Sequence, residues 1–172
     1  MFSLSPQPLE GAKLKESLRS PRAGALAIFE GWVRDHNEGK RVSGLLYEAF
    51  PELCAKEAEA IFQEVKKKFP ILKAKCVHRV GKLAVGDMAV WVGVTSAHRQ
   101  DAFAACRYII DNIKMRLPIW KKEYYLNRQS AWVICTECSG SRNDHTHSHT
   151  IVRRRIGHTP RQKRNSPAVL KK

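Results

Sequence analysis

Apolar residues recur at helical spacing in two long stretches of this chain. One stretch, Pro51–Phe69, carries them on a single face, which predicts a helix whose first turn contains Pro51. A second helix is predicted over roughly His98–Met115, with Ser96 as its N-cap and Pro118 preventing its continuation. The predicted buried stripes are Cys54, Ala58, Ile61, Phe62, Val65 and Phe69 in the first helix, and Ala102, Phe103, Cys106, Ile109, Ile110 and Ile113 in the second.

Short apolar runs between turn residues predict strands around these helices. The runs cover Ala25–Val33, Ser43–Phe50, Leu72–Val80, Met88–Thr95, Lys121–Leu126 and Ala131–Cys135. The first two are predicted to pair as a hairpin across the polar loop Arg34–Arg41, and Gly81–Asp87 is predicted to be a connector. With a short helix over Leu9–Leu18, the order β-β-α-β-β-α-β-β predicts an α+β fold with a mostly antiparallel sheet.

Composition indicates one globular domain followed by a different kind of segment. The chain has 172 residues, of which 43% are hydrophobic and 27% charged, and no apolar run is long enough to span a bilayer. Its N-terminus lacks the pattern of a secretory signal, so we expect a cytoplasmic location and no membrane partner. Residues 1–138 are predicted to form the domain, and residues 139–172 a basic, disordered tail with few apolar residues.

The net charge of +15 is divided between these two parts. Residues 139–172 hold nine of the 31 basic residues and one of the 16 acidic residues, which gives them a net charge of +8 and leaves +7 elsewhere. A high charge on the whole chain would indicate binding to nucleic acid. Because about half of the charge lies in the tail, that indication is weak for the folded part.

The cysteine pattern does not indicate a disulfide framework, because the count is odd and no export signal is present. Cys54, Cys76 and Cys106 occupy apolar positions of predicted elements, so we expect them to be buried. Potential zinc ligands follow near the end of the chain, at Cys135, Cys138, His145, His147 and His149. A second paired motif with apolar residues to pack is missing, so a disordered tail is preferred and no metal site is predicted.

Basic residues gather at both ends of the second long helix. His98 and Arg99 stand at its start, and its end is followed by a cationic cluster next to Trp120. Guanidinium groups and a helix start suit a phosphate, and a lysine among other cations is a candidate for proton transfer or nucleophilic attack. The candidate site residues are Trp32, Val33, Arg34, His98, Arg99, Lys114, Lys121, Lys122 and Glu123. Complementation of the helix dipole and protection of an edge strand explain the lysines equally well.

Four segments resemble the large, catalytic subunit of molybdopterin synthase, the MoaE family. They are FEGWVRDHN at Phe29–Asn37, HRVGKLAVGD at His78–Asp87, VGVTSAHR at Val92–Arg99 and KMRLPIWKKE at Lys114–Glu123. The resemblance extends from about Gly24 to Trp132, with the segments in the same order and spacing. It is specific because four separate motifs carry it.

The resemblance implies an α/β hammerhead fold and a sulfur-transfer reaction. In this family the enzyme converts cyclic pyranopterin monophosphate into molybdopterin, whose dithiolene takes its sulfur from the C-terminal Gly-Gly thiocarboxylate of a small ubiquitin-like carrier subunit. Two large subunits form a homodimer within a heterotetramer, and no cofactor is implied beyond the pterin substrate. The family's two lysines fall on Lys114, the predicted principal catalytic group, and Lys121. Its substrate-contacting residues fall on Val33 and Arg34 after Trp32, on His98 and Arg99, and on Lys121, Lys122 and Glu123.

Two other functions remain open from the residues alone. The basic run Val152–Arg164 suits a protein that binds nucleic acid or another polyanion. The folded part lacks the exposed aromatic residues interleaved with basic ones that would accompany such a function, so a nucleic-acid partner is not favoured. A scaffold that only binds a ubiquitin-like partner would bind it without converting the pterin.

Overall fold

Two sheets and three helices make up the part of the chain that the computed structural model describes, residues 1–127 and 129–133. The first sheet has the order β1-β5-β7-β2 and contains Phe2–Ser5, Ile71–Arg79, Met88–Ser96 and Ala25–Trp32. Its β1–β5 pairing is parallel, and the described pairings of the other strands are antiparallel. The predicted α+β class with mostly antiparallel pairing is therefore confirmed.

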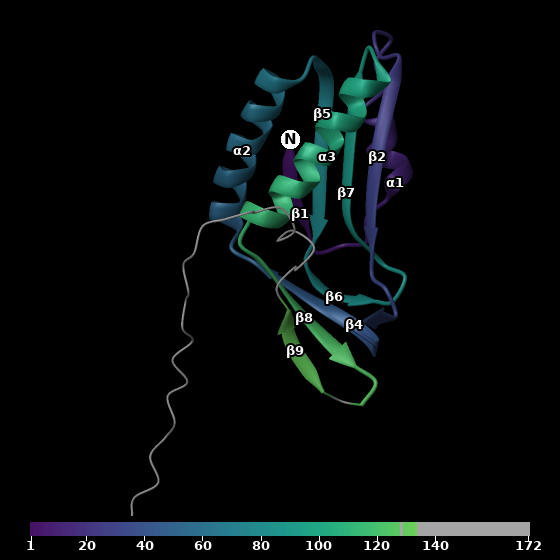
Figure 1. Ribbon diagram of the computed structural model, residues 1–172, viewed down its shortest axis with the longest axis vertical. Coiled ribbons are helices and arrows are strands. Elements are labelled where there is room, and N and C mark those ends of the chain that lie inside the picture. The colour runs from purple at the N-terminus through teal and green to yellow at the C-terminus, as the bar shows by residue number, and fades with distance from the viewer. Residues whose placement is uncertain (128, 134–172) are drawn as a thin grey trace, which may run out of the picture. The chain divides into compact units, whose positions relative to one another are not determined.

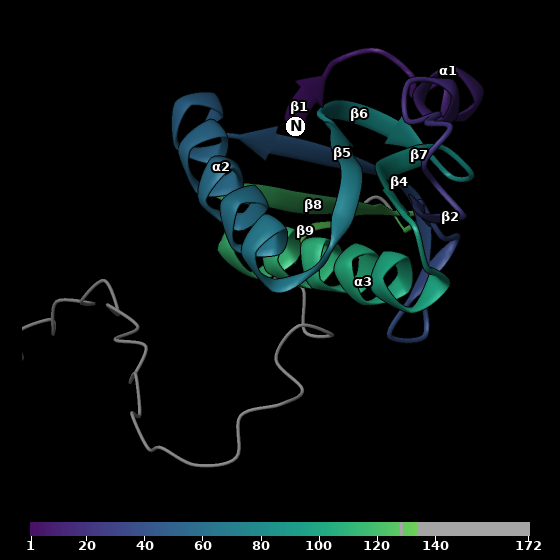
Figure 2. The same cartoon turned by 90° about the horizontal axis from the view of Figure 1, so that it is seen from above.

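Helices α2 (Pro51–Lys68) and α3 (Arg99–Arg116) cover one face of this sheet. The short helix α1 (Gly11–Glu16) contacts β7, and Figure 2 shows it away from α2 and α3. The main core lies between the sheet and the two long helices, and it includes Cys54, Ile61, Val92 and Ile109. The expectation that Cys54, Cys76 and Cys106 are buried is also confirmed.

The second sheet has the order β3-β4-β8-β9, with β6 also paired to β4. Its strands are His36–Asn37, Lys40–Ala49, Ile119–Tyr125, Ser130–Val133 and, for β6, Gly81–Ala84. A small second core of Val33, Val42, Leu45, Leu83 and Ala89 packs beside it. Figure 1 shows this sheet next to the C-terminal end of α3.

The predicted hairpin between Ala25–Val33 and Ser43–Phe50 is wrong. β2 pairs with β7 in the first sheet, whereas β4 pairs with β6 and β8 in the second. The intervening loop instead forms its own small hairpin of β3 against the start of β4, with left-handed φ angles of 47° at Glu38 and 75° at Gly39. The chain thus changes sheet at the polar loop that carries Arg34.

Other local predictions also needed correction. β1 was not predicted, and the expected connector Gly81–Asp87 contains β6. The N-cap of α3 is His98 rather than Ser96, because buried Ser96 ends β7 and its Oγ donates to the carbonyl of Pro70 at 2.9 Å. Phe103 is 67% exposed, and Ala105 takes its expected place in the buried stripe.

Two predictions fall partly or wholly beyond the described ranges. The domain boundary at residues 138–139 and the tail with its potential zinc ligands lie outside them. Within those ranges, no helix combines the length and the apolar character needed to cross a membrane.

Candidate functional site

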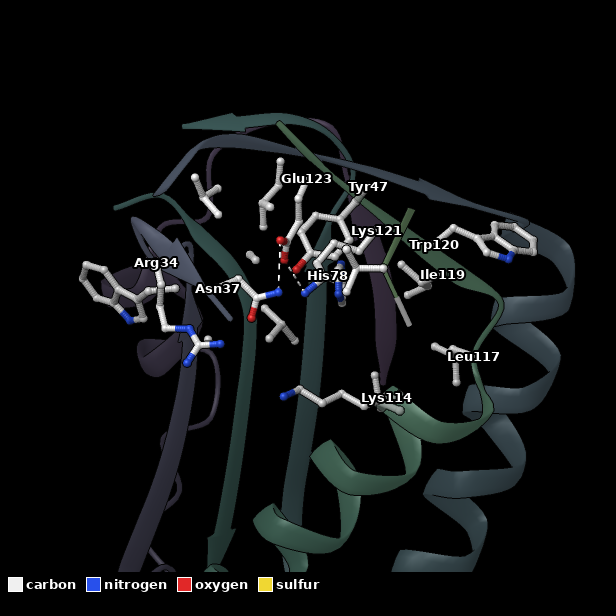
Figure 3. A pocket seen from close by; sticks show the side chains of 18 of the residues that line it. Arg34, Asn37, Tyr47, His78, Lys114, Leu117, Ile119, Trp120, Lys121 and Glu123 are labelled. Atoms are coloured by element: carbon white, nitrogen blue, oxygen red, sulfur yellow. Dashed lines mark hydrogen bonds and ion pairs between the residues drawn. The ribbon is translucent and has the colours of Figure 1, made fainter. Parts of the chain in front are cut away.

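A cavity of about 530 Å³ lies where the C-terminal end of α3 meets the second sheet and the loop after β2. We call it the α3 cavity. Its volume is within the range of sites that hold small organic ligands. Apolar side chains form much of its wall, among them Trp32, Val42, Ile113, Leu117 and Trp120. Its polar lining includes Arg34, Asn37, His78, Lys114, Lys121 and Glu123 (Figure 3).

Lys114 reaches the α3 cavity because of how α3 ends. The last turn packs Ile113 into the core, and Leu117 takes an extended conformation with ψ of 134° before Pro118. The chain then turns into β8, which runs along the cavity. Lys114 points into the cavity in Figure 3 and makes no hydrogen bond or ion pair with any residue that the structure describes.

Lys121 reaches the same cavity from β8 and is held there by Glu123. Residues two apart in a strand face the same side, so both side chains point inward and their Nζ and Oε1 atoms are 2.9 Å apart. Lys122, between them, does not line the cavity and lies 5.7 Å from the centroids of the Tyr124 and Trp132 rings.

Glu123 is a buried carboxylate surrounded by donors. It accepts hydrogen bonds from the Tyr125 hydroxyl at 2.9 Å and from Asn37 Nδ2 at 3.1 Å, in addition to its ion pair with Lys121. Burial alone would raise the pKa of Glu123, but these hydrogen bonds and the Lys121 charge lower that pKa below its ordinary value. Glu123 is therefore ionised at neutral pH and fixes the position of Lys121.

The loop after β2 brings Arg34 to the cavity. Asn37 ties this loop to β8 through Glu123, a contact between residues 86 positions apart. Val33 is buried beneath the loop, where its N–H donates to the Asp87 carbonyl at 2.9 Å and its own carbonyl accepts from Gly86 at 2.9 Å. Val33 thus anchors the loop without lining the cavity, whereas Trp32 lines it and is 58% exposed.

His98 and Arg99 lie at the opposite end of α3. Both are exposed, and neither lines the α3 cavity. Lys114 follows Arg99 by 15 positions, which corresponds to about 22 Å of helix at 1.5 Å per residue. One chain therefore brings Trp32, Arg34, Lys114, Lys121 and Glu123 to a single cavity and leaves His98 and Arg99 apart from it.

His78 is a cavity residue that the sequence reasoning missed as a site candidate. It lies on β5, is 8% exposed and contacts the Tyr47 ring edge-on, with 4.9 Å between centroids. Its segment carried the family resemblance, which was the available signal. The alternation of β5 gave no sign that a histidine there would face a cavity.

The arrangement suits an anionic ligand with an aromatic or heterocyclic part. Arg34, Lys114 and Lys121 supply positive charge, and the apolar wall offers contact area. Burial raises the pKa of the Cys76 thiol and raises that of Cys106 to about 11, so neither is a ready nucleophile. The described residues contain no cluster of three potential metal ligands.

Comparisons with known proteins agree on one family. The molybdopterin synthase catalytic subunit of Thermoplasma volcanium is 45% identical over 115 residues, which cover 67% of this chain and 84% of that protein. The crystal structure of molybdopterin synthase from Staphylococcus aureus matches with a TM-score of 0.72 and 35% identity, covering 77% of this chain and 96% of that one.

A more distant structure shares the fold. The complex of subunits 1 and 2 of molybdopterin-converting factor from Helicobacter pylori contains a chain that matches with a TM-score of 0.63 and 20% identity, covering 79% of this chain and 90% of that one. The model of the family described as MoaE protein matches residues 4–116. The chain belongs to the MoaE family.

Proposed function

We propose that this chain is the catalytic subunit of a molybdopterin synthase. It transfers sulfur from the thiocarboxylate of a small carrier protein to cyclic pyranopterin monophosphate and so forms the dithiolene of molybdopterin. The observation that carries this proposal is the α3 cavity, where Lys114, Lys121 and Arg34 meet beside an apolar wall. Family membership and the named activity of relatives with 45% identity support it.

The roles of the cavity residues follow from their charges and contacts. Arg34 offers parallel N–H donors to the cyclic phosphate. Lys114, which has no ion-pair partner among the described residues, orients the attacking thiocarboxylate and moves a proton during attack. Lys121, held by Glu123, stabilises the negative charge that develops on the same substrate. The sulfur nucleophile belongs to the carrier, so no cysteine of this chain takes part.

The partner is a small ubiquitin-like subunit that ends in Gly-Gly. The Helicobacter pylori complex of two subunits of molybdopterin-converting factor supports a two-subunit assembly. Two large subunits form a homodimer within the heterotetramer. We expect the assembly to work in the cytoplasm and to need no resident cofactor, because the pterin is a substrate.

A second copy of the chain explains how His98 and Arg99 can take part in the site although they lie far from Lys114 in their own chain. These residues lie about 22 Å of helix away from Lys114 within one chain. In the homodimer, His98 and Arg99 of one copy complete the anion site around Lys114 of the other. Mixed dimers test this: Arg99→Ala and Lys114→Ala chains, each impaired alone, should regain activity when subunits exchange. Activity that stays at the level of the single variants contradicts the shared site.

Reconstitution tests the proposed activity. The purified chain is mixed with a thiocarboxylated carrier and cyclic pyranopterin monophosphate, and molybdopterin is measured after oxidation to a fluorescent derivative. We expect turnover that requires all three components. Carrier binding without product would show a scaffold instead. A chain truncated after residue 138 should keep its synthase activity. If the truncated chain also loses affinity for nucleic acid, the basic tail has a separate, accessory function.

A further inference from the structure

His78 is a polar residue of the α3 cavity that has no role in the sulfur-transfer scheme above. Its ring is almost fully buried and contacts Tyr47 edge-on. Figure 3 shows it grouped with Tyr47 and Lys121 in the cavity lining. Tyr47 and Lys121 are cross-strand neighbours on β4 and β8, so His78 lies next to the site of the proposed chemistry.

The backbone determines which nitrogen of His78 carries hydrogen. Nδ1 is 2.8 Å from the carbonyl oxygen of Arg79, which can only accept, so Nδ1 donates. Burial lowers the pKa of His78 to about 4; the bond to Arg79 opposes this shift, and the charge of Lys114 adds to it. The ring is therefore neutral at neutral pH, and Nε2 keeps a lone pair.

Few hydrogen-bond acceptors line the cavity near His78, and the other neutral ones are the side-chain oxygens of Asn37 and Tyr47. Arg34, Lys114 and Lys121 are donors without acceptor capacity. Glu123 is already engaged by Lys121, Tyr125 and Asn37. Among the residues that the structure describes, none donates a hydrogen bond to Nε2 of His78. This nitrogen is thus an acceptor that a ligand in the cavity can use.

We propose that His78 is a further substrate-binding residue, whose Nε2 accepts a hydrogen bond from an N–H group of the pterin ring. This inference rests on the proposed function, since it takes the cyclic pterin as the ligand. A pterin carries amide and amino N–H donors, and burying a donor without an acceptor is unfavourable. The cations of the cavity bind the phosphate and the thiocarboxylate but cannot accept from these donors. His78 therefore recognises the heterocycle.

Three substitutions separate the functions of the two ring nitrogens. His78→Asn keeps a donor near the Nδ1 position and removes the acceptor, His78→Gln places an amide near the Nε2 position, and His78→Phe removes both. We expect the KM for cyclic pyranopterin monophosphate to rise about tenfold in the Asn and Phe variants, with kcat changed less than about threefold. His78→Gln should recover most of this loss. An unimpaired His78→Asn beside an impaired His78→Phe would show a purely structural role and overturn the inference.

A measurement on the unsubstituted chain remains informative if the variants do not fold. In protein labelled with nitrogen-15 histidine, saturating cyclic pterin should shift the Nε2 resonance of His78 and leave Nδ1 in place. An unmoved Nε2 resonance overturns the inference while turnover by the same protein leaves the proposed function intact. Absence of both turnover and pterin binding overturns the proposed function and this inference together.

Discussion

The two ends of helix α3 carry similar basic residues in different surroundings. At the N-terminal end, His98 and Arg99 are exposed and do not line the α3 cavity of their own chain. At the C-terminal end, Lys114 points into a cavity that also contains Lys121 and Arg34. The residue types at the two ends do not reveal this difference. It comes from the elements that surround each end.

The C-terminal end is completed by segments that are distant in sequence. β8 supplies Lys121 and Glu123, the loop after β2 supplies Arg34 and Asn37, and β5 supplies His78. The contact between Asn37 and Glu123 holds two of these segments together. The candidate site thus forms where the chain changes sheet, and in the proposed homodimer the N-terminal end of α3 takes part through a second copy.

The largest expected effect is that of Lys114→Ala. Removing a group that moves a proton and orients the nucleophile should lower kcat about 1000-fold, or by roughly 4 kcal/mol of transition-state stabilisation. Lys67→Ala is the matched control, because Lys67 is an exposed lysine in the last turn of α2, which has the same length as α3. The two variants should melt within a few degrees of the unsubstituted chain. Equal activity of the two variants would contradict a catalytic role of Lys114 at the C-terminal end of α3.

The second effect is a dependence of stability on pH that arises at the C-terminal end. The pKa of His78 is about 4 in the folded chain, against an ordinary value of 6.5. Below pH 6.5 the unfolded chain binds a proton that the folded chain does not, so stability falls as the pH drops toward 4, by about 3 kcal/mol in all. Urea denaturation at pH 7.5 and 4.5 should show that the free energy of unfolding falls less in His78→Gln than in the unsubstituted chain. The exposed His98→Gln is the control, and equal losses in both variants would contradict this account.

The third effect concerns the ion pair that holds Lys121. Glu123→Gln keeps the shape of the side chain and removes its charge, which leaves the partly buried Lys121 ammonium without its carboxylate. We expect a loss of about 2 kcal/mol in the free energy of unfolding, because hydrogen bonds to buried charges are stronger than neutral ones. Glu48→Gln, an exposed position in the same sheet, should change stability by less than about 0.5 kcal/mol. Similar values for both variants would show that the network does not stabilise the site.

The smallest effect compares two arginines along α3. Arg116 joins α3 to α2 through Glu64 at 2.9 Å and Glu57 at 3.3 Å, whereas the one ion-pair partner of Arg107 among the described residues is Asp111, at 3.5 Å on the exposed face. Arg116→Ala should lower the free energy of unfolding by about 1 kcal/mol, and Arg107→Ala by less than about 0.5 kcal/mol because solvent screens its pair. Chemical denaturation measures both. A larger loss for Arg107→Ala would be the opposite of what the contacts indicate.

Periodicity predicted the long helices because their buried faces repeat over five turns. It placed Pro51 at the start of α2 and the break after α3 at Pro118. The hairpin prediction failed because neighbouring strands were assumed to pair, whereas β2 and β4 enter different sheets. β1 was missed because four residues are too few to show a clear alternation, and its parallel partner lies about 70 residues later in the chain.

The candidate site was predicted in part. Lys114, Lys121 and Arg34 do meet, but the separation of His98 and Arg99 from them is a consequence of helix length. Strand alternation would have excluded Lys122 from the face that carries Lys121 and Glu123. His78 was missed because a histidine in an apolar strand is typical of a core position, and only tertiary structure places it in a cavity.

Protection of lysines from acylation tests the central claim, that the cyclic pterin binds in the α3 cavity beside Lys114. The purified protein is treated with a limiting amine-reactive reagent, with and without cyclic pyranopterin monophosphate, and labelling of each lysine is measured by mass spectrometry. The account predicts that the pterin lowers the labelling of Lys114 several-fold and leaves that of Lys67 unchanged. Labelling of Lys114 that is the same with and without saturating pterin would contradict it.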